Sequence, residues 1–405
     1  MGEGSIAGAD LRRTAVLALL GRRGPTSRAD IARELEMSPA SVGQVTKRLI
    51  EQGVLETLDY APSRGGRPGQ RLGLVGTAGR AVGVKVAADH LAIVDMRLDG
   101  QAISSRTDPF DTMGPDAVSR LALRLQPLVE EGEAPLLGIG IGVPGIVNRP
   151  DVGQVDAPVL NWSGVNIGRH LRGALGVPII VENDVKALAV AERLYGHGRM
   201  RGDFVVITIG RGIGFASAAD GVVRRGARGG AGEIAHVAVE PDGPLCACGT
   251  RGCLEALVGA EGLLQVARSA GLLGPSQGPE RLADLADRGE PRARAIYAQA
   301  GERLARSMAA PIAVLDPEVI LVAGEGTAAW RHWEEAFRST LLAMLPSAMG
   351  DLAIEVSSWD DTSWARGAAA IVLATPFEQK ALAGRQRALV LARLHGHSIS
   401  DEEAS

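Results

Sequence analysis

The three cysteines of this 405-residue chain lie close together, as Cys246, Cys248 and Cys253. A histidine, His236, precedes them on the same stretch. Three thiolates and one imidazole make a complete tetrahedral ligand set for a zinc ion. Because four protein ligands leave no position for water, residues 236–253 predict structural rather than catalytic zinc.

Two other interpretations of the cysteines remain open: three unrelated buried thiols, or a disulfide between two of them. The odd number of cysteines and the absence of any other cysteine disfavour an oxidised framework. Two carboxylates, Glu233 and Glu255, lie beside the cluster and are not needed to complete the zinc ligands. We therefore expect them to face a polar binding site.

The elements that precede this cluster begin with three expected helices. They cover residues 9–22, the segment that starts at Ser27, and the segment from Ser38 to about Gln52. Ser27 and Ser38 are good N-caps, and Pro39 suits the first position of a helix. The predicted core stripe of the third helix contains Val42, Val45, Leu49 and Ile50. The last two helices, joined by a short turn, are typical of a helix-turn-helix.

The polar face of the third helix carries residue types that suit DNA. Its candidate DNA contacts are Ser38, Ala40, Ser41, Gln44, Lys47 and Arg48. Small and amide side chains can approach base edges, and Gln44 can pair with adenine. Lys47 and Arg48 suit phosphates. A helical bundle used for dimerisation is the alternative interpretation of this pattern.

A basic loop after the third helix favours DNA binding over that alternative. Expected strands at 54–58 and 71–75 flank a glycine-rich tip that carries Arg64 and Arg67. Such a loop is typical of a wing, from which arginines can enter a narrow minor groove. The first 75 residues contain eleven basic and eight acidic residues, a net +3, whereas the whole chain carries −4. A basic segment on an acidic remainder fits a nucleic-acid-binding domain.

No apolar run approaches the roughly 20 residues that span a bilayer. The first residues also lack the charged-then-apolar order of a secretory signal. We therefore expect a cytoplasmic protein with no membrane partner.

From Arg80 onward, short apolar runs alternate with longer helical patterns, which indicates an α/β architecture. The strand candidates are 81–87, 91–96, 137–142, 179–181, 204–209, 215–218, 319–322 and 354–356. Helices are expected near 115–130, 166–175, 185–195, 257–270, 293–314, 330–345 and 363–374. The charged segment after Glu378 is expected to form a loose helix that ends in disorder.

Several segments in this region resemble the ROK family of repressors, open reading frames and sugar kinases. They are APVLNW (157–162), VPIIVENDVKALAVAE (177–192), IGRGIGFA (209–216), GAGEIAH (230–236) and CACGTRGCLE (246–255). The resemblance implies an actin-like, ribonuclease-H-like fold with two α/β lobes. We expect a winged helix-turn-helix at residues 1–76, a sugar-binding ROK domain at 77–378 and a tail at 379–405.

The resemblance implies a sugar site. ROK kinases hold sugar with an Asn-Asp pair, whose aspartate is the general base; the matching residues are Asn183 and Asp184. The other implied sugar contacts are Glu233, His236 and Glu255, and His236 also resembles a zinc ligand of the family. The alternative for Asn183 and Asp184 is capping of the helix that follows. Both roles are compatible.

The implied nucleotide site departs from the family pattern. Kinases of the family carry D-x-G-G-T after the first strand, where this chain reads Lys85-Val86-Ala87-Ala88-Asp89. A second loop, G-T-G in kinases, is Gly210-Arg211-Gly212, and the adenosine-side segment reads Ala323-Gly324-Glu325-Gly326. Three altered elements predict lost kinase activity, with Asp184 retained as a vestigial base that contacts sugar.

The chain is therefore expected to be a sugar-responsive transcriptional regulator, and most simply a repressor of carbohydrate-metabolism genes. A homodimer or homotetramer would bind operator DNA, and a sugar or sugar phosphate would be the effector. The main alternative is an active ATP-dependent sugar kinase with an appended DNA-binding domain. Control by a phosphotransfer-system protein instead of a free sugar is a third possibility.

Overall fold

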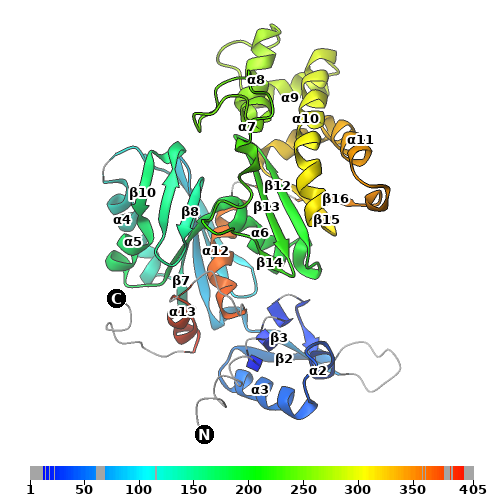
Figure 1. Cartoon of the computed structure of the whole chain (residues 1–405). Helices are drawn as coiled ribbons and strands as arrows, with labels where there is room; N and C mark the ends of the chain where they lie inside the picture. Colours follow the sequence, from blue (N-terminus) through cyan, green and yellow to red (C-terminus); the bar gives the residue numbers. More distant parts are fainter. Residues whose placement is uncertain are drawn as a thin grey trace. The chain divides into compact units, whose positions relative to one another are not determined.

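The computed structural model describes residues 12, 13, 15–17, 19–21, 23–60, 69–114, 116–357, 359–360, 362–377, 384 and 386–395 (Figure 1). The chain divides into two compact units, Met1–Met200 with Thr362–Ser405, and Arg201–Asp361. The division into residues 1–76, 77–378 and 379–405 remains a prediction. No helix among the described residues is long and apolar enough to cross a membrane.

The N-terminal segment contains the predicted helices and a small antiparallel sheet. The described residues between Arg12 and Arg23 are helical, followed by α2 (Arg28–Glu34) and α3 (Pro39–Glu51). The sheet has the order β1 (Thr26–Ser27), β3 (Gln70–Leu74), β2 (Leu55–Tyr60). The short β1 was not predicted, because two residues are too few to show a strand pattern.

Two predicted caps are confirmed. The Ser27 hydroxyl accepts a hydrogen bond from the Asp30 N–H at 3.2 Å, and the Ser38 hydroxyl accepts one from the Ser41 N–H at 3.2 Å. Each hydroxyl satisfies a backbone N–H that the first turn of a helix leaves without a partner. Pro39 occupies the first turn of α3, as predicted.

The predicted core stripe of α3 is partly wrong. Val42 and Leu49 are buried, but the third buried residue is Thr46, while Val45 and Ile50 are only partly buried. A threonine is tolerated there because its hydroxyl donates to the carbonyl of Val42, one turn earlier, at 2.8 Å. The buried stripe therefore follows the positions 42, 46 and 49.

The first unit contains a five-stranded sheet with the order β11-β7-β4-β5-β6. Its strands are β11 (Ile179–Asn183), β7 (Leu136–Val143), β4 (Arg80–Val86), β5 (His90–Arg97) and β6 (Ala102–Pro109). One face packs on α4 (Ala117–Glu130) and α5 (Ile167–Leu175) through a shared apolar core. The other face packs on α12 (Ser363–Leu373), which also contacts α6 (Asp184–Tyr195) (Figure 1).

Helix α12 approaches the sheet so closely that only glycine fits beneath it. A Cβ atom on Gly83 of β4 would collide with the carbonyl of Ala365, and one on Gly140 of β7 with the carbonyl of Ala368. The alanines that surround this contact on α12 are also small and buried. This packing places the N-terminal turn of α12 beside β4, and with it Trp364 beside Lys85.

The second unit contains a five-stranded sheet with the order β14-β13-β12-β15-β16. The strands are β14 (Val222–Val223), β13 (Ile213–Ala219), β12 (Phe204–Ile209), β15 (Val319–Ala323) and β16 (Ala353–Val356). The helices are α7 (Leu254–Val258), α8 (Ala260–Ser269), α9 (Pro279–Asp287), α10 (Pro291–Leu315) and α11 (Glu334–Met344). Apolar residues of these helices and strands form one core.

All eight strand candidates after Arg80 lie in strands. The elements that were not predicted include β6, α9, β14 and a small sheet of β8 (Ile146–Arg149), β9 (Gln154–Ala157) and β10 (Trp162–Asn166). Helix α13 (Gln386–Leu394) lies within the segment after Glu378 where a loose helix was expected. The helix expected near 257–270 is two helices, because the backbone is extended at Gly259.

Candidate functional site

The four predicted zinc ligands lie together in the second unit. The donor atoms of His236, Cys246, Cys248 and Cys253 all lie within 4.8 Å of one another. His236 ends the short helix η4 (Glu233–His236), and Cys253 immediately precedes α7. Single β-bridges from Ala238 to Cys253 and from Leu245 to Arg251 hold the intervening chain in a compact loop.

The spacing of these donors fits zinc. Tetrahedral zinc, with bonds of about 2.3 Å to sulfur and about 2.05 Å to nitrogen, requires donor atoms roughly 3.5 to 3.8 Å apart. The Sγ atoms of Cys248 and Cys253 are 3.6 Å apart, and Cys246 Sγ is 3.6 Å from His236 Nδ1. The Nδ1 atom of His236 therefore faces the sulfurs, and the other ring nitrogen is not needed by the cluster.

Two glycines allow the loop to turn. Gly249 and Gly252 have positive φ angles of 89° and 68°, which favour glycine. A Cβ atom on Gly252 would also collide with the carbonyl of Glu240. A substitution at this position would therefore displace the chain that carries Cys253.

The thiols of the cluster differ in their pKa values. Burial raises the pKa of the Cys246 thiol, and burial also raises the pKa of Cys253, to about 12. Burial also acts to raise the pKa of Cys248, but hydrogen bonds with Thr250, Cys246 and Cys253 together outweigh it and lower the pKa of this thiol to about 7. Because zinc binds thiolates, metal binding would release protons from these thiols.

The Glu255 carboxylate has two partners within the second unit. Its Oε2 atom accepts a hydrogen bond from the Ile213 N–H at 3.3 Å, and its Oε1 atom lies 3.9 Å from Cys246 Sγ. Glu255 thus connects the cysteine cluster to the loop that contains Gly210, Arg211 and Gly212. Glu233 is half-buried at the start of η4.

The carboxylate of a second glutamate lies on the same loop. The Arg211 N–H donates to Glu325 Oε1 at 2.9 Å, and a Cβ atom on Gly210 would collide with the Glu325 side chain. The backbone N–H groups of Arg211 and Ile213 therefore both donate to carboxylates of the chain itself. A phosphate would have to displace Glu325 and would be repelled by its charge.

Asn183 is the N-cap of α6. Its Oδ1 atom accepts from the N–H groups of Val185 and Lys186, each at 3.1 Å, and its Nδ2 atom donates to the Gly145 carbonyl at 3.0 Å. The capping role is therefore present. The amide group is held in one orientation by these three hydrogen bonds.

Asp184 forms an ion pair with Lys85. Lys85 lies in β4 and Asp184 is the first residue of α6, and their side chains are only 10% and 9% exposed. The Lys85 ammonium group donates to Asp184 Oδ2, while Asp184 Oδ1 accepts from the Val185 N–H at 2.9 Å. Both carboxylate oxygens of Asp184 therefore have partners within the chain.

Lys85 also lies against an aromatic ring. Its Nζ atom is 4.9 Å from the centre of the Trp364 ring, at the start of α12. Neither Trp364 nor the Lys85–Asp184 pair was predicted. The available signal was a single lysine within the apolar run of β4, because an uncompensated charge in a buried strand would be costly.

The predicted sugar contacts lie in both units. Asn183 and Asp184 belong to the first, and Glu233, His236 and Glu255 belong to the second. Asp89 is exposed and lies 2.8 Å from the His90 ring. Ala235, between Glu233 and His236 in η4, is buried.

The predicted DNA-binding face of α3 is accessible to solvent. Ser38, Ala40, Gln44, Lys47 and Arg48 are exposed and Ser41 is half-buried. The only ion pair described for Lys47 is a long contact, 3.8 Å, with Glu51 one turn later. Arg64 and Arg67 lie outside the described residues.

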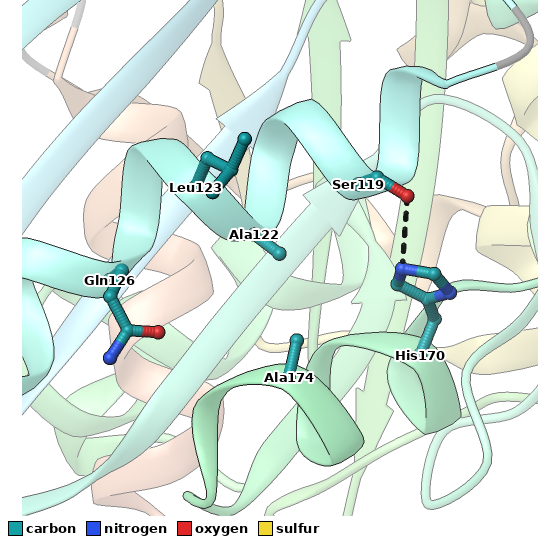
Figure 2. A pocket seen from close by; sticks show the side chains of 6 residues that line it. All are labelled: Ser119, Ala122, Leu123, Gln126, His170 and Ala174. Atoms are coloured by element: carbon teal, nitrogen blue, oxygen red, sulfur yellow. Dashed lines mark hydrogen bonds between the residues drawn. The ribbon is translucent and has the colours of Figure 1, made fainter.

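A separate pocket of about 280 Å³ lies between α4 and α5 of the first unit (Figure 2). It is lined by Ser119, Ala122, Leu123, Gln126, His170 and Ala174. Ser119 Oγ lies 3.3 Å from His170 Nε2 at one end. None of the predicted sugar, metal or DNA contacts lines this pocket.

Family comparisons divide the sequence into two matches. The ROK family profile matches residues 82–375, and the MarR family profile matches residues 8–66. The first match covers most of the chain and includes the cysteine cluster, the Asn183-Asp184 pair and Lys85.

Individual relatives include regulators and an enzyme. The chain is 26% identical to a xylose repressor of Caldicellulosiruptor bescii, over 86% of this chain and 91% of that protein. It is 28% identical to a glucokinase of Thermotoga maritima, over 72% of this chain and 97% of that protein. A solved ROK family transcriptional regulator, a homologue of the Escherichia coli MLC protein, is 25% identical, with a TM-score of 0.80 and coverage of 96% and 99%.

Proposed function

Because the chain belongs to the ROK family, we propose that it is a sugar-responsive transcriptional regulator, a repressor of carbohydrate-metabolism genes. Two features together support this proposal. The chain has an N-terminal winged helix, and Asp184, which would be the general base in a kinase, forms a buried ion pair with Lys85. The similarity to a xylose repressor and to a solved ROK regulator along nearly the whole chain supports it.

DNA is the proposed partner of the N-terminal segment. The exposed polar face of α3 and the similarity of residues 8–66 to the MarR family support this assignment. A homodimer or homotetramer would match the two-fold symmetry of an operator. The predicted wing arginines, Arg64 and Arg67, remain part of this proposal. Chromosomal DNA as the partner implies action in the cytoplasm.

A sugar or sugar phosphate is the proposed effector. Asn183, Asp184, Glu233, His236 and Glu255 are its proposed contacts. Carboxylate, amide and imidazole groups suit sugar hydroxyls, each of which both donates and accepts hydrogen bonds. The effector regulates DNA binding only if it binds one conformation of the chain more tightly than the other.

We assign no kinase activity to this chain. A general base must accept a proton from the attacking hydroxyl. The Asp184 oxygens already accept hydrogen bonds from Lys85 and from the Val185 N–H. On the nucleotide side, Glu325 lies on the backbone of the Gly210–Gly212 loop. These contacts favour a sensor over the glucokinase-like alternative.

Zinc is the proposed structural cofactor, held by His236, Cys246, Cys248 and Cys253. When bound, it would supply no chemistry to a reaction but would fix the loop between η4 and α7. Glu255 follows this loop by two residues and contacts both Cys246 and Ile213. Loss of the metal would therefore disturb two proposed sugar contacts, His236 and Glu255.

Incubation of the full-length protein with ATP, magnesium and a panel of hexoses distinguishes the two candidate functions. We expect no sugar-dependent ADP release, together with sugar-dependent change in operator affinity measured by gel shift. Sugar-dependent turnover that disappears in Asp184→Asn would support the kinase instead. A kinase from the same family, assayed in parallel, shows that the assay conditions permit turnover.

A further inference from the structure

We propose that Lys85 makes the effector site selective for a sugar that carries an anionic group, a phosphate or a carboxylate, beside Asp184. The proposal rests on the proposed function, because it assumes that Asp184 lies at the sugar site. It goes further by naming the chemical class of the effector and the residue that recognises it.

The first argument is the position of the charge. Lys85 and Asp184 are both at least nine-tenths buried and form an ion pair. A carboxylate alone is a sufficient hydrogen-bond acceptor for a neutral sugar hydroxyl. Burying a cation beside this carboxylate loses the hydration free energy of the ammonium group, and the attraction within the ion pair does no more than offset that loss. The lysine therefore adds little to the stability of the fold.

The second argument is the balance of local charge. Asp184 is the first residue of α6 and Trp364 is the second residue of α12, and Lys85 contacts both. A helix N-terminus contributes about half a positive charge. The ammonium group of Lys85 and the N-terminal turn of α6 therefore both act on the Asp184 carboxylate.

The segment that carries Asp184 holds two further charged residues. Glu182 and Lys186 are both buried on the same segment and carry opposite charges. The Asn183 cap occupies the N–H groups of Val185 and Lys186, but it is uncharged. Lys85 and the N-terminus of α6 would attract an anionic group of a ligand more strongly than a neutral hydroxyl.

The third argument is the hydrogen-bonding capacity of Lys85. An ammonium group has three N–H donors. Among the described residues, one donor is directed to Asp184 and the ring of Trp364 lies nearby. Donors therefore remain for the oxygens of a ligand, and phosphate and carboxylate oxygens form stronger hydrogen bonds with a cation than hydroxyls do.

Isothermal titration calorimetry of the full-length protein tests the proposal. A thermal-shift screen first selects the hexoses to be tested. For each of them, the titrated ligands are the neutral hexose, its 6-phosphate and its 6-carboxylate. We expect the wild type to bind an anionic member at least about tenfold more tightly than the neutral sugar. Lys85→Met should abolish that preference by weakening only the anionic ligand, and Lys85→Arg should retain most of it.

Arg106→Met is the matched control, because it removes a positive charge from an exposed position on β6 of the same unit. It should leave the preference unchanged. A lysine that only supports the fold would affect neutral and anionic sugars alike in Lys85→Met, and this result would overturn the proposal. A neutral sugar preferred by the wild type would also overturn it.

The same titrations separate this proposal from the proposed function. Binding of a neutral sugar with no effect of Lys85→Met would contradict the anionic class and leave a sugar-responsive regulator intact. No binding by any member of the sets, together with unchanged operator affinity, would contradict the proposed function itself. Comparing the 6-phosphate with the 6-carboxylate identifies which anionic group the site accepts.

Discussion

A carboxylate whose oxygens already accept hydrogen bonds within the chain is less available to accept one from a substrate hydroxyl. Asp184 is in this position through its contact with Lys85. Glu325 has a comparable effect on the other unit, where it accepts from the Arg211 N–H. At the scale of single residues, Lys85 thus occupies the Asp184 carboxylate and Glu325 occupies the Arg211 N–H. The kinase alternative would need both of these groups for its substrates.

The zinc ligands provide a prediction at the same scale. Cys248→Ser should lower the zinc content from about one per chain to a small fraction, because a hydroxyl is a much poorer zinc ligand than a thiolate. Elemental analysis after dialysis against a weak chelator measures this loss. Ala247→Ser, which adds a hydroxyl beside the cluster and removes no ligand, should keep its zinc. A Cys248→Ser protein with normal zinc content would contradict the ligand assignment.

The Lys85–Asp184 pair shows where prediction from sequence ends. The four metal ligands lie close together along the chain, so their grouping is visible in their spacing. Lys85 and Asp184 are 99 residues apart. Their contact depends on the pairing of β4, β7 and β11 and on the start of α6 after β11, and neither is evident from one sequence.

At the scale of elements, the contact of α12 with its sheet depends on two residues that lack side chains. Gly140→Ala should destabilise the protein by at least about 3 kcal/mol, because the added methyl group would collide with backbone rather than with a flexible side chain. Urea denaturation followed by circular dichroism measures the change.

Gly173→Ala is the control for this substitution. Gly173 lies in α5, is exposed, and has no atom within 4 Å of an added Cβ. Alanine there should stabilise the helix by about 0.5 to 1 kcal/mol. Equal stabilities of the two variants would show that α12 is not held as closely as the structure indicates.

Elements with a buried face were predictable, and those without one were not. The strands β4, β7, β11, β12 and β15 are buried along nearly their whole length and appear as apolar runs. In β6 almost every residue is exposed, so no alternation marks it. The strands β8 to β10 are four or five residues long, too short for a period to be recognised.

The DNA-binding face of α3 supports a further prediction at this scale. Lys47→Ala should weaken operator binding and reduce the slope of log affinity against log salt by about one, because one phosphate contact is lost. Fluorescence anisotropy at several salt concentrations measures both quantities. Arg33→Ala removes an equal charge from α2, outside the predicted face, and should change the slope less. The same slope in both variants would exclude a phosphate contact by Lys47.

At the scale of the whole molecule, the proposed regulator must couple two distant binding events. Thermodynamic linkage requires that the effector and the operator change each other's affinity by the same factor. If a saturating effector weakens operator binding twentyfold, saturating operator must weaken effector binding about twentyfold. We therefore expect equal factors from anisotropy with labelled operator and from calorimetry with the effector, both with the intact chain.

Loss of the cysteine cluster should reduce the factor by which the effector changes operator affinity. It should have less effect on the affinity for operator in the absence of effector. Glu255 connects Cys246 to the backbone of Ile213, so removal of the metal would disturb contacts on the effector side without touching α3. In the Cys248→Ser variant we expect operator affinity within about twofold of wild type in the absence of effector, and a coupling factor near one. Unchanged coupling in a variant shown to lack zinc would mean that the cluster does not take part in the response, even if it stabilises the fold.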